Sequence, residues 1–186
     1  MKKMTLALLL ASSMTSGAAF ANIHTLSAGY AQSYVEGFKH IRGFNLQYRY
    51  ENFSPLSVLA SFSWMKGDET DHYRYSGNQM KETIEARYIS LLAGPAYRIN
   101  EYISLYALGG VAHSKADVNA SLTSRDGNYA LHASDSAKAY SFAYGAGVII
   151  NPVENLSVNI GYEGTQAGQD IDSAIDGFIL GVGYSF

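Results

Sequence analysis

The chain has no cysteine and few charged residues. Of its 186 residues, three are proline and 16% are charged, against about 25% in an ordinary soluble domain. The absence of cysteine excludes a disulfide framework, a cysteine-based metal site and a thiol nucleophile. Acidic residues exceed basic ones, 16 to 13, and this balance argues against nucleic acid as the main partner, because a phosphate backbone is bound by basic surfaces. We therefore expect no nucleic-acid partner.

Long apolar runs are absent after the first 21 residues. A transmembrane helix needs about 20 consecutive apolar residues, and no later stretch offers them. The composition does not predict disorder either, because 13% of the residues are aromatic and the mean hydropathy is −0.06. These absences exclude a helical membrane bundle and a disordered chain, so we expect a folded protein without transmembrane helices.

The first 21 residues have the layout of a secretory signal peptide. Met1-Lys2-Lys3 is basic, the segment Thr5–Ala11 is apolar, and Ala19-Phe20-Ala21 fits the A-x-A cleavage pattern. An N-terminal membrane anchor is the alternative, but this apolar segment is too short to cross about 30 Å of hydrocarbon. We predict a signal peptide over 1–21 and a mature chain over 22–186, located in the periplasm, in the medium or in the outer membrane.

The mature chain alternates apolar with small or polar residues eight times. Residues 44–51 are the clearest case, because Phe44, Leu46 and Tyr48 alternate with polar residues and would point to one face of a strand. The eight predicted strands cover residues 25–30, 44–51, 57–64, 89–99, 103–112, 140–150, 157–163 and 178–186. Five apolar residues fall on the otherwise polar face: Leu59, Leu92, Leu108, Ile149 and Ile179.

The connections between these strands alternate in length. Residues 52–55, 100–102 and 151–155 predict short turns rich in Asn and Pro. The segments 32–42, 66–85, 114–139 and 164–176 are longer and polar, and we expect them to be loops. Short turns at one rim and long loops at the other are typical of a bacterial outer-membrane barrel, whose long loops lie outside the cell.

A soluble β-sandwich would also alternate, so the two faces must be compared. The polar face carries mostly Gly, Ala, Ser and Asn, which suit a crowded barrel interior better than open water. The apolar face carries aromatic residues toward both strand ends, as in the two girdles of a membrane barrel. The predicted girdles are Tyr30, Trp64, Tyr140 and Tyr162 near the loops, and Tyr48, Tyr50, Tyr97, Tyr184 and Phe186 near the turns. We predict an all-β fold, an eight-stranded antiparallel up-and-down transmembrane β-barrel.

Pro95 lies inside one of the predicted strands. Proline has no backbone N–H and removes one hydrogen bond from a sheet. A closed barrel has no edge strand to place it on, so we expect a bulge or a broken ladder bond near Gly94-Pro95.

Four charged residues are predicted to point into the barrel. Glu51 and Glu163 could form an acid/base pair, but charges in a narrow interior need partners. We therefore expect a polar plug in which these carboxylates pair with Arg49 and Arg98.

Several longer motifs resemble one known family. Residues 43–51, 93–100, 144–147, 151–155 and 181–186 are similar to the Ail/Lom/OmpX (PagC-like) family of small outer-membrane proteins. The resemblance covers all eight strands and the short turns and lapses in the long loops. It implies an integral outer-membrane protein that acts in adhesion, invasion, serum resistance or intracellular survival.

No pattern predicts an enzyme, a metal site or a cofactor. The five histidines, His24, His40, His72, His113 and His132, lack metal-ligand spacing. Asp71-His72 near Ser76 is better explained as solvated residues of a polar loop than as a hydrolytic set.

Two of the long loops are predicted to be hairpin extensions that bind a ligand. Alternation continues over 118–133 around Asp126-Gly127, and over 72–78 around Ser76-Gly77. The candidate binding residues are Tyr73, Arg74, Tyr75 and Tyr129. The expected partners are outer-membrane lipid, lipopolysaccharide, and host cell-surface, matrix or complement proteins, bound by a monomer. The alternative function is an envelope-integrity protein that engages lipopolysaccharide without a host ligand, and an open pore is disfavoured because eight strands leave little space inside.

Overall fold

A computed structural model describes residues 23–35, 38–52, 54–75, 78–123, 130–165 and 175–186, so the predicted signal peptide lies outside the described residues. Within these ranges the chain forms eight strands. They are β1 (Ile23–Val35), β2 (Phe38–Glu51), β3 (Leu56–Tyr75), β4 (Asn78–Arg98), β5 (Ile103–Thr123), β6 (Ala130–Val153), β7 (Leu156–Thr165) and β8 (Ile175–Ser185). None of the described residues belongs to a helix long and apolar enough to cross a membrane.

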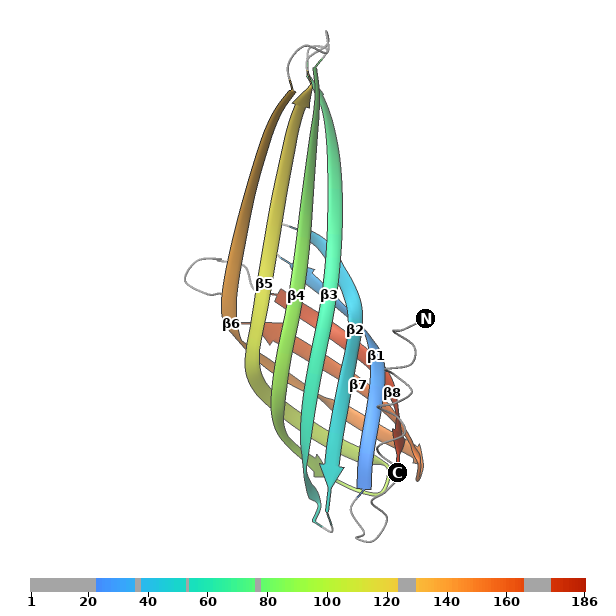
Figure 1. Cartoon of the computed structure of the whole chain (residues 1–186). Helices are drawn as coiled ribbons and strands as arrows, with labels where there is room; N and C mark the ends of the chain where they lie inside the picture. The colour runs from blue at the N-terminus through green and yellow to red at the C-terminus, as the bar shows by residue number, and fades with distance from the viewer. Residues whose placement is uncertain (1–22, 36–37, 53, 76–77, 124–129, 166–174) are drawn as a thin grey trace, which may run out of the picture.

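The eight strands form one closed barrel. Each strand pairs antiparallel with the next, and β1 pairs with β8 from Thr25↔Ser185 to Val35↔Ile175, which closes the sheet (Figure 1). Closure matters in lipid, where an open edge would leave backbone groups without hydrogen-bond partners. The predicted fold class and all eight predicted strands are confirmed.

Side chains alternate between a filled interior and an apolar outer surface. The five apolar residues that interrupted the polar face lie inside, with Leu59 and Leu92 only 1% exposed. Polar side chains such as Asn45 fill the rest of the interior, while outward residues such as Leu91 and Val111 are about 60% exposed. The predicted division into inward and outward positions is therefore confirmed. The five apolar residues that broke the alternation pack against one another and against polar side chains inside the barrel.

The strands reach further than the sequence predicted. Segments 66–85 and 114–139 were expected to be loops, but β3 and β4 stay paired up to Tyr75↔Asn78, and β5 and β6 up to Thr123↔Ala130. Most of 32–42 and parts of 164–176 are strand as well. The strand limits were set too short because no apolar residue in segment 66–71 marks the continuing strand, whereas the alternation further out, over 72–78 and 118–133, did predict paired hairpin extensions.

The backbone ladder breaks at Pro95 as expected. β4 pairs with β5 at Ala93↔Gly109 and again at Ala96↔Tyr106, with no pairs between them. The register is the same on both sides, so this is a broken ladder and not a bulge. On its other side Pro95 stays opposite Val58 of β3.

Candidate functional site

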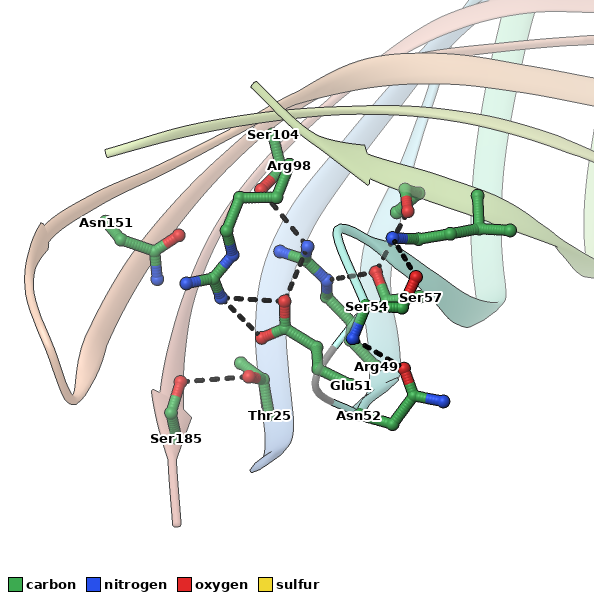
Figure 2. A network of polar contacts seen from close by, with 12 residues as sticks. Thr25, Arg49, Glu51, Asn52, Ser54, Ser57, Arg98, Ser104, Asn151 and Ser185 are labelled. Carbon is green, nitrogen blue, oxygen red and sulfur yellow. Dashed lines mark hydrogen bonds and ion pairs between the residues drawn. The ribbon is translucent and has the colours of Figure 1, made fainter. Parts of the chain in front are cut away.

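A network of ion pairs closes the short-turn end of the barrel (Figure 2). Glu51 of β2 accepts contacts of 2.7 Å from Arg49 and of 2.7 and 2.8 Å from Arg98 of β4. Arg49 also donates to the hydroxyl oxygens of Ser57 at 2.9 Å and of Ser104 at 3.1 Å. The network thus joins the carboxylate and guanidinium groups of β2 and β4 to hydroxyl groups of two further strands, β3 and β5.

This network is structural in character. Arg49 and Glu51 are almost completely buried, and the side chain of Arg98 is about one-third exposed at the barrel mouth. Buried charges are tolerated only when they are paired and hydrogen-bonded. The network meets this condition, so it plugs the barrel with polar side chains as predicted.

Glu163 departs from the prediction. This buried carboxylate pairs with neither arginine and instead accepts hydrogen bonds from Ser63 at 2.8 Å and from Tyr88 at 2.7 Å. It lies too far from the turn end of its strand to reach the network around Glu51, and the two carboxylates share no described partner. The expected arginine pairing is right for Glu51 and wrong for Glu163, and their separate surroundings do not form an acid/base pair.

Among the described residues, no group of three or more His, Cys, Asp or Glu side chains is placed to hold a metal ion.

Four strands rise beyond the rest of the barrel and form an extended sheet (Figure 1). Pairing of β2 with β3 ends at Arg42↔Lys66, and pairing of β6 with β7 ends at Ala143↔Thr165. Beyond these pairs β3, β4, β5 and β6 continue to pair only with one another. Residues 67–75 of β3 and 130–142 of β6 are therefore sheet edges that no other described strand covers.

The predicted binding residues lie on this extended sheet or next to it. Tyr73, Arg74 and Tyr75 are at the far end of β3, and their register partners on β4 are residues 78–80. Tyr129 lies outside the described residues, just before β6. The prediction that these segments are hairpin extensions is confirmed for the paired strands, and the binding role stays a prediction.

Sequence reasoning missed a row of basic side chains at the base of the extended sheet. The register places five of them side by side on consecutive strands: Arg42, Lys66, Arg87, Lys115 and Lys138. We call this set the basic row. Most of these positions fall in segments predicted as loops, and only the register of four strand pairs reveals that they are neighbours.

Aromatic contacts mark both rims of the apolar band. Near the extended sheet, the rings of Phe44 and Trp64 lie 5.7 Å apart. At the short-turn end, His24 contacts the hydroxyl of Tyr48 at 2.7 Å and stacks on the ring of Phe186. Amphipathic rings at these positions fit the headgroup regions of a bilayer.

A family model described as Enterobacterial Ail/Lom protein matches residues 1–186. The chain belongs to the Ail/Lom family. This Ail/Lom protein is 43% identical over 168 residues to the virulence membrane protein PagC of Salmonella typhimurium, covering 89% of this chain and 88% of PagC. It is 37% identical over 174 residues to outer membrane protein X of Escherichia coli, covering 92% of this chain and 91% of that protein.

Solved structures of Ail from Yersinia pestis, the attachment invasion locus protein, have the same fold. The crystal structure of Ail matches this Ail/Lom protein with a TM-score of 0.68 and 35% identity, covering 89% of this chain and 99% of Ail. A complex of Ail with the heparin analogue sucrose octasulfate matches with a TM-score of 0.67 and 36% identity, over the same shares. With these relatives and this barrel, the protein is an integral protein of the outer membrane.

Proposed function

We propose that this Ail/Lom protein is a surface-binding virulence protein whose extended sheet attaches to host cell-surface, matrix or complement molecules. The barrel holds the sheet in the outer membrane. The hairpins β3–β4 and β5–β6 carry the binding outside the cell.

The open edges of the extended sheet are the observation that carries this proposal. Residues 67–75 of β3 and 130–142 of β6 have a paired neighbour on one side only. An uncovered edge offers backbone N–H and C=O groups to an incoming extended segment, which is a common mode of peptide recognition. Tyr73, Arg74 and Tyr75 belong to residue types enriched at interfaces and lie along one of these edges.

The relatives support a general virulence role at the outer membrane. PagC is named for virulence and Ail for attachment and invasion. The Ail complex with a heparin analogue supports the inclusion of sulfated host glycans among the candidate ligands. The names of these relatives describe membrane and virulence proteins and not enzymes, which agrees with a non-catalytic role.

The register allows the hairpins to be removed cleanly. Replacing residues 71–82 by Asn-Gly keeps the pair Thr70↔Thr83, and replacing 119–134 by Asn-Gly keeps Val118↔Asp135. Asn-Gly favours the type I′ turn that joins two adjacent strands. The full chain and these variants would be expressed in a non-adherent, serum-sensitive bacterium, and adhesion to host cells and survival in serum would be scored.

We expect each shortened variant to remain folded, judged by its heat-dependent shift on gels, and the doubly shortened variant to lose adhesion and serum survival. Glu154→Gln, at an exposed turn on the opposite rim, is the matched control and should behave like the parent. Binding that survives both replacements would exclude the far ends of the hairpins and would move the site to residues 36–42 or 170–176, or to the edge residues 67–70 and 135–142 that the replacements keep. Failure of the parent chain to confer either property would favour the envelope-integrity function instead.

A further inference from the structure

The two faces of the extended sheet differ in charge. The outer face begins with the basic row, whereas the inner face continues from the barrel interior, where Met65 and Tyr88 are buried. The pairing of β3 to β6 runs from these residues to the far strand ends without a register shift, so the alternation of faces is kept throughout. Over 67–75, 78–86, 116–123 and 130–137, the inner-face positions hold no lysine or arginine and four acids: Glu69, Asp71, Glu82 and Asp135.

Apolar residues occupy most of the other inner-face positions. Next to the barrel, Ala86 of β4 lies opposite Ala116 of β5, and two positions further out Ile84 lies opposite Val118. On β5 every inner-face position of the extended sheet is apolar, and we call these four residues the apolar track: Ala116, Val118, Ala120 and Leu122.

Carboxylates flank the apolar track on both sides. One row of the register runs from Glu69 of β3 through Ile84 and Val118 to Asp135 of β6. In the next row, Glu82 of β4 is the neighbour of the track. Adjacent strands are about 4.8 Å apart, so acids of β4 and β6 lie one strand away from the track, on opposite sides of it.

The other described strands leave this face open. The pairing of β1 with β8 ends at Val35↔Ile175, while β3, β4, β5 and β6 rise well beyond it (Figure 1). On the inner face, Asp135 is exposed and Ile84 and Val118 are only half-buried. An apolar strip with a polar rim that meets water marks a binding surface.

We propose that the inner face binds a cationic amphipathic helix that lies along β5. Such a helix has an apolar stripe flanked by lysine and arginine, and this pattern complements the apolar track with its flanking carboxylates. A helix is about 10–12 Å wide, close to the distance of about 10 Å between β4 and β6. The six steps from Ala116 to Leu122 span about 20 Å, which matches about 13 residues of helix.

A helix suits this face better than an extended segment does. Both β4 and β5 have paired neighbours on each side, so their backbone groups are already used in the sheet. A ligand on the face must therefore satisfy its own backbone hydrogen bonds, as a helix does. The inference goes beyond the proposed host binding, because it concerns the face of the sheet and stands even if the chain confers neither adhesion nor serum survival.

The proposed ligand class also gives the site a consequence. Short cationic amphipathic helices bind to membrane surfaces through their apolar side. A helix that lies on the inner face has its apolar side covered by the apolar track. Capture there should therefore hold such a peptide away from the lipid.

The test uses the refolded chain in phosphatidylcholine nanodiscs and a fluorescent peptide of leucine and lysine, about 14 residues long, that forms an amphipathic helix. Binding to empty nanodiscs is subtracted. We expect saturable binding that high salt weakens. A scrambled peptide of the same composition and an analogue with glutamate in place of lysine should bind far more weakly.

Two variants remove the two halves of the site. Ile84→Thr with Val118→Thr removes the apolar centre but keeps β-branched side chains that suit a strand, and binding should weaken by roughly tenfold. Asp135→Asn removes one flanking carboxylate, and binding should weaken by roughly two- to fivefold.

Matched controls separate these effects from general ones. Ile84→Val with Val118→Ile keeps the apolar centre and should retain binding. Asp117→Asn removes the same charge as Asp135→Asn, but on the outer face next to Val118, and should also retain binding. Urea unfolding without peptide identifies any variant that has simply lost stability.

Four results would overturn the proposal. The first three are equal binding by the threonine variant and the parent, equal binding of the scrambled peptide, and equal losses from Asp117→Asn and Asp135→Asn. The fourth is a dimer of the parent in detergent, measured by sedimentation, that the threonine variant does not form, because this would assign the face to a second copy of the chain. The threonine variant keeps both sheet edges, so its adhesion in the bacterial assay tests the edge proposal separately.

Discussion

The hydroxyl group of Tyr106 on β5 occupies the space over Gly161 on β7. A Cβ atom at position 161 would collide with this oxygen, and the next nearest heavy atom would be 3.4 Å away. The same hydroxyl lies over Gly147 on β6, but there a Cβ atom would also meet the backbone oxygen of Ile160 at 2.5 Å. One buried ring thus fills the space that two glycines on neighbouring strands leave inside the barrel.

This difference predicts a selective rescue. Gly161→Ala should destabilise the barrel by about 1–3 kcal/mol, the usual effect of overpacking, and Tyr106→Phe should recover most of that loss by removing the colliding oxygen. Gly147→Ala should not be rescued, because its contact with the backbone remains. The measurement is urea unfolding in lipid vesicles for the single and double variants. Equal rescue at both positions would contradict the packing described for Tyr106.

The ion-pair network predicts a large effect from one neutral substitution. Glu51→Gln leaves Arg49 and Arg98 without their shared carboxylate and should lower the free energy of unfolding by about 3–5 kcal/mol. Glu154→Gln, exposed in the turn between β6 and β7, removes the same charge and should change stability by less than about 0.5 kcal/mol. Unfolding in vesicles measures both, and similar losses for the two variants would argue against a buried network.

The lipid-facing surface predicts a cost that depends on depth. Leu46 is 42% exposed and lies midway along the membrane part of β2, so Leu46→Arg should destabilise the barrel by roughly 2–4 kcal/mol. Leu105 is 46% exposed but is the third residue of β5, nearer the rim. Leu105→Arg should therefore have a smaller effect in the same vesicles. If refolding stability were unchanged in both variants, the assignment of the outward face would be wrong.

The filled interior predicts that the barrel does not conduct. Arg49, Tyr88, Leu59 and Leu92 are each at most 2% exposed inside it, and an eight-stranded barrel is only wide enough to hold side chains. Pure refolded protein in planar bilayers should show no stable porin-like conductance. Reproducible, long-lived channels would contradict this expectation.

Residue patterns alone were sufficient for the architecture. Because a strand sends successive side chains to opposite faces, the alternation around residues 44–51 predicted both the strand and its orientation. The break at Pro95 also followed from sequence, since proline cannot donate to a ladder. Strand ends were predicted less well, because β3 continues past its last pair with β2 through residues 66–71, where the sequence has no apolar residue to mark a strand.

What the sequence determined by itself is therefore the barrel, its inward and outward faces and its short turns, because these follow from local period and local turn chemistry. Only the tertiary structure decided which distant residues meet. Barrel closure and strand register brought Arg98 to Glu51 and left Glu163 with other partners. They also set Tyr106 over Gly161 and aligned Arg42 with Lys138 across three intervening strands. Register is a property of whole strand pairs, so no single segment of the chain contains it.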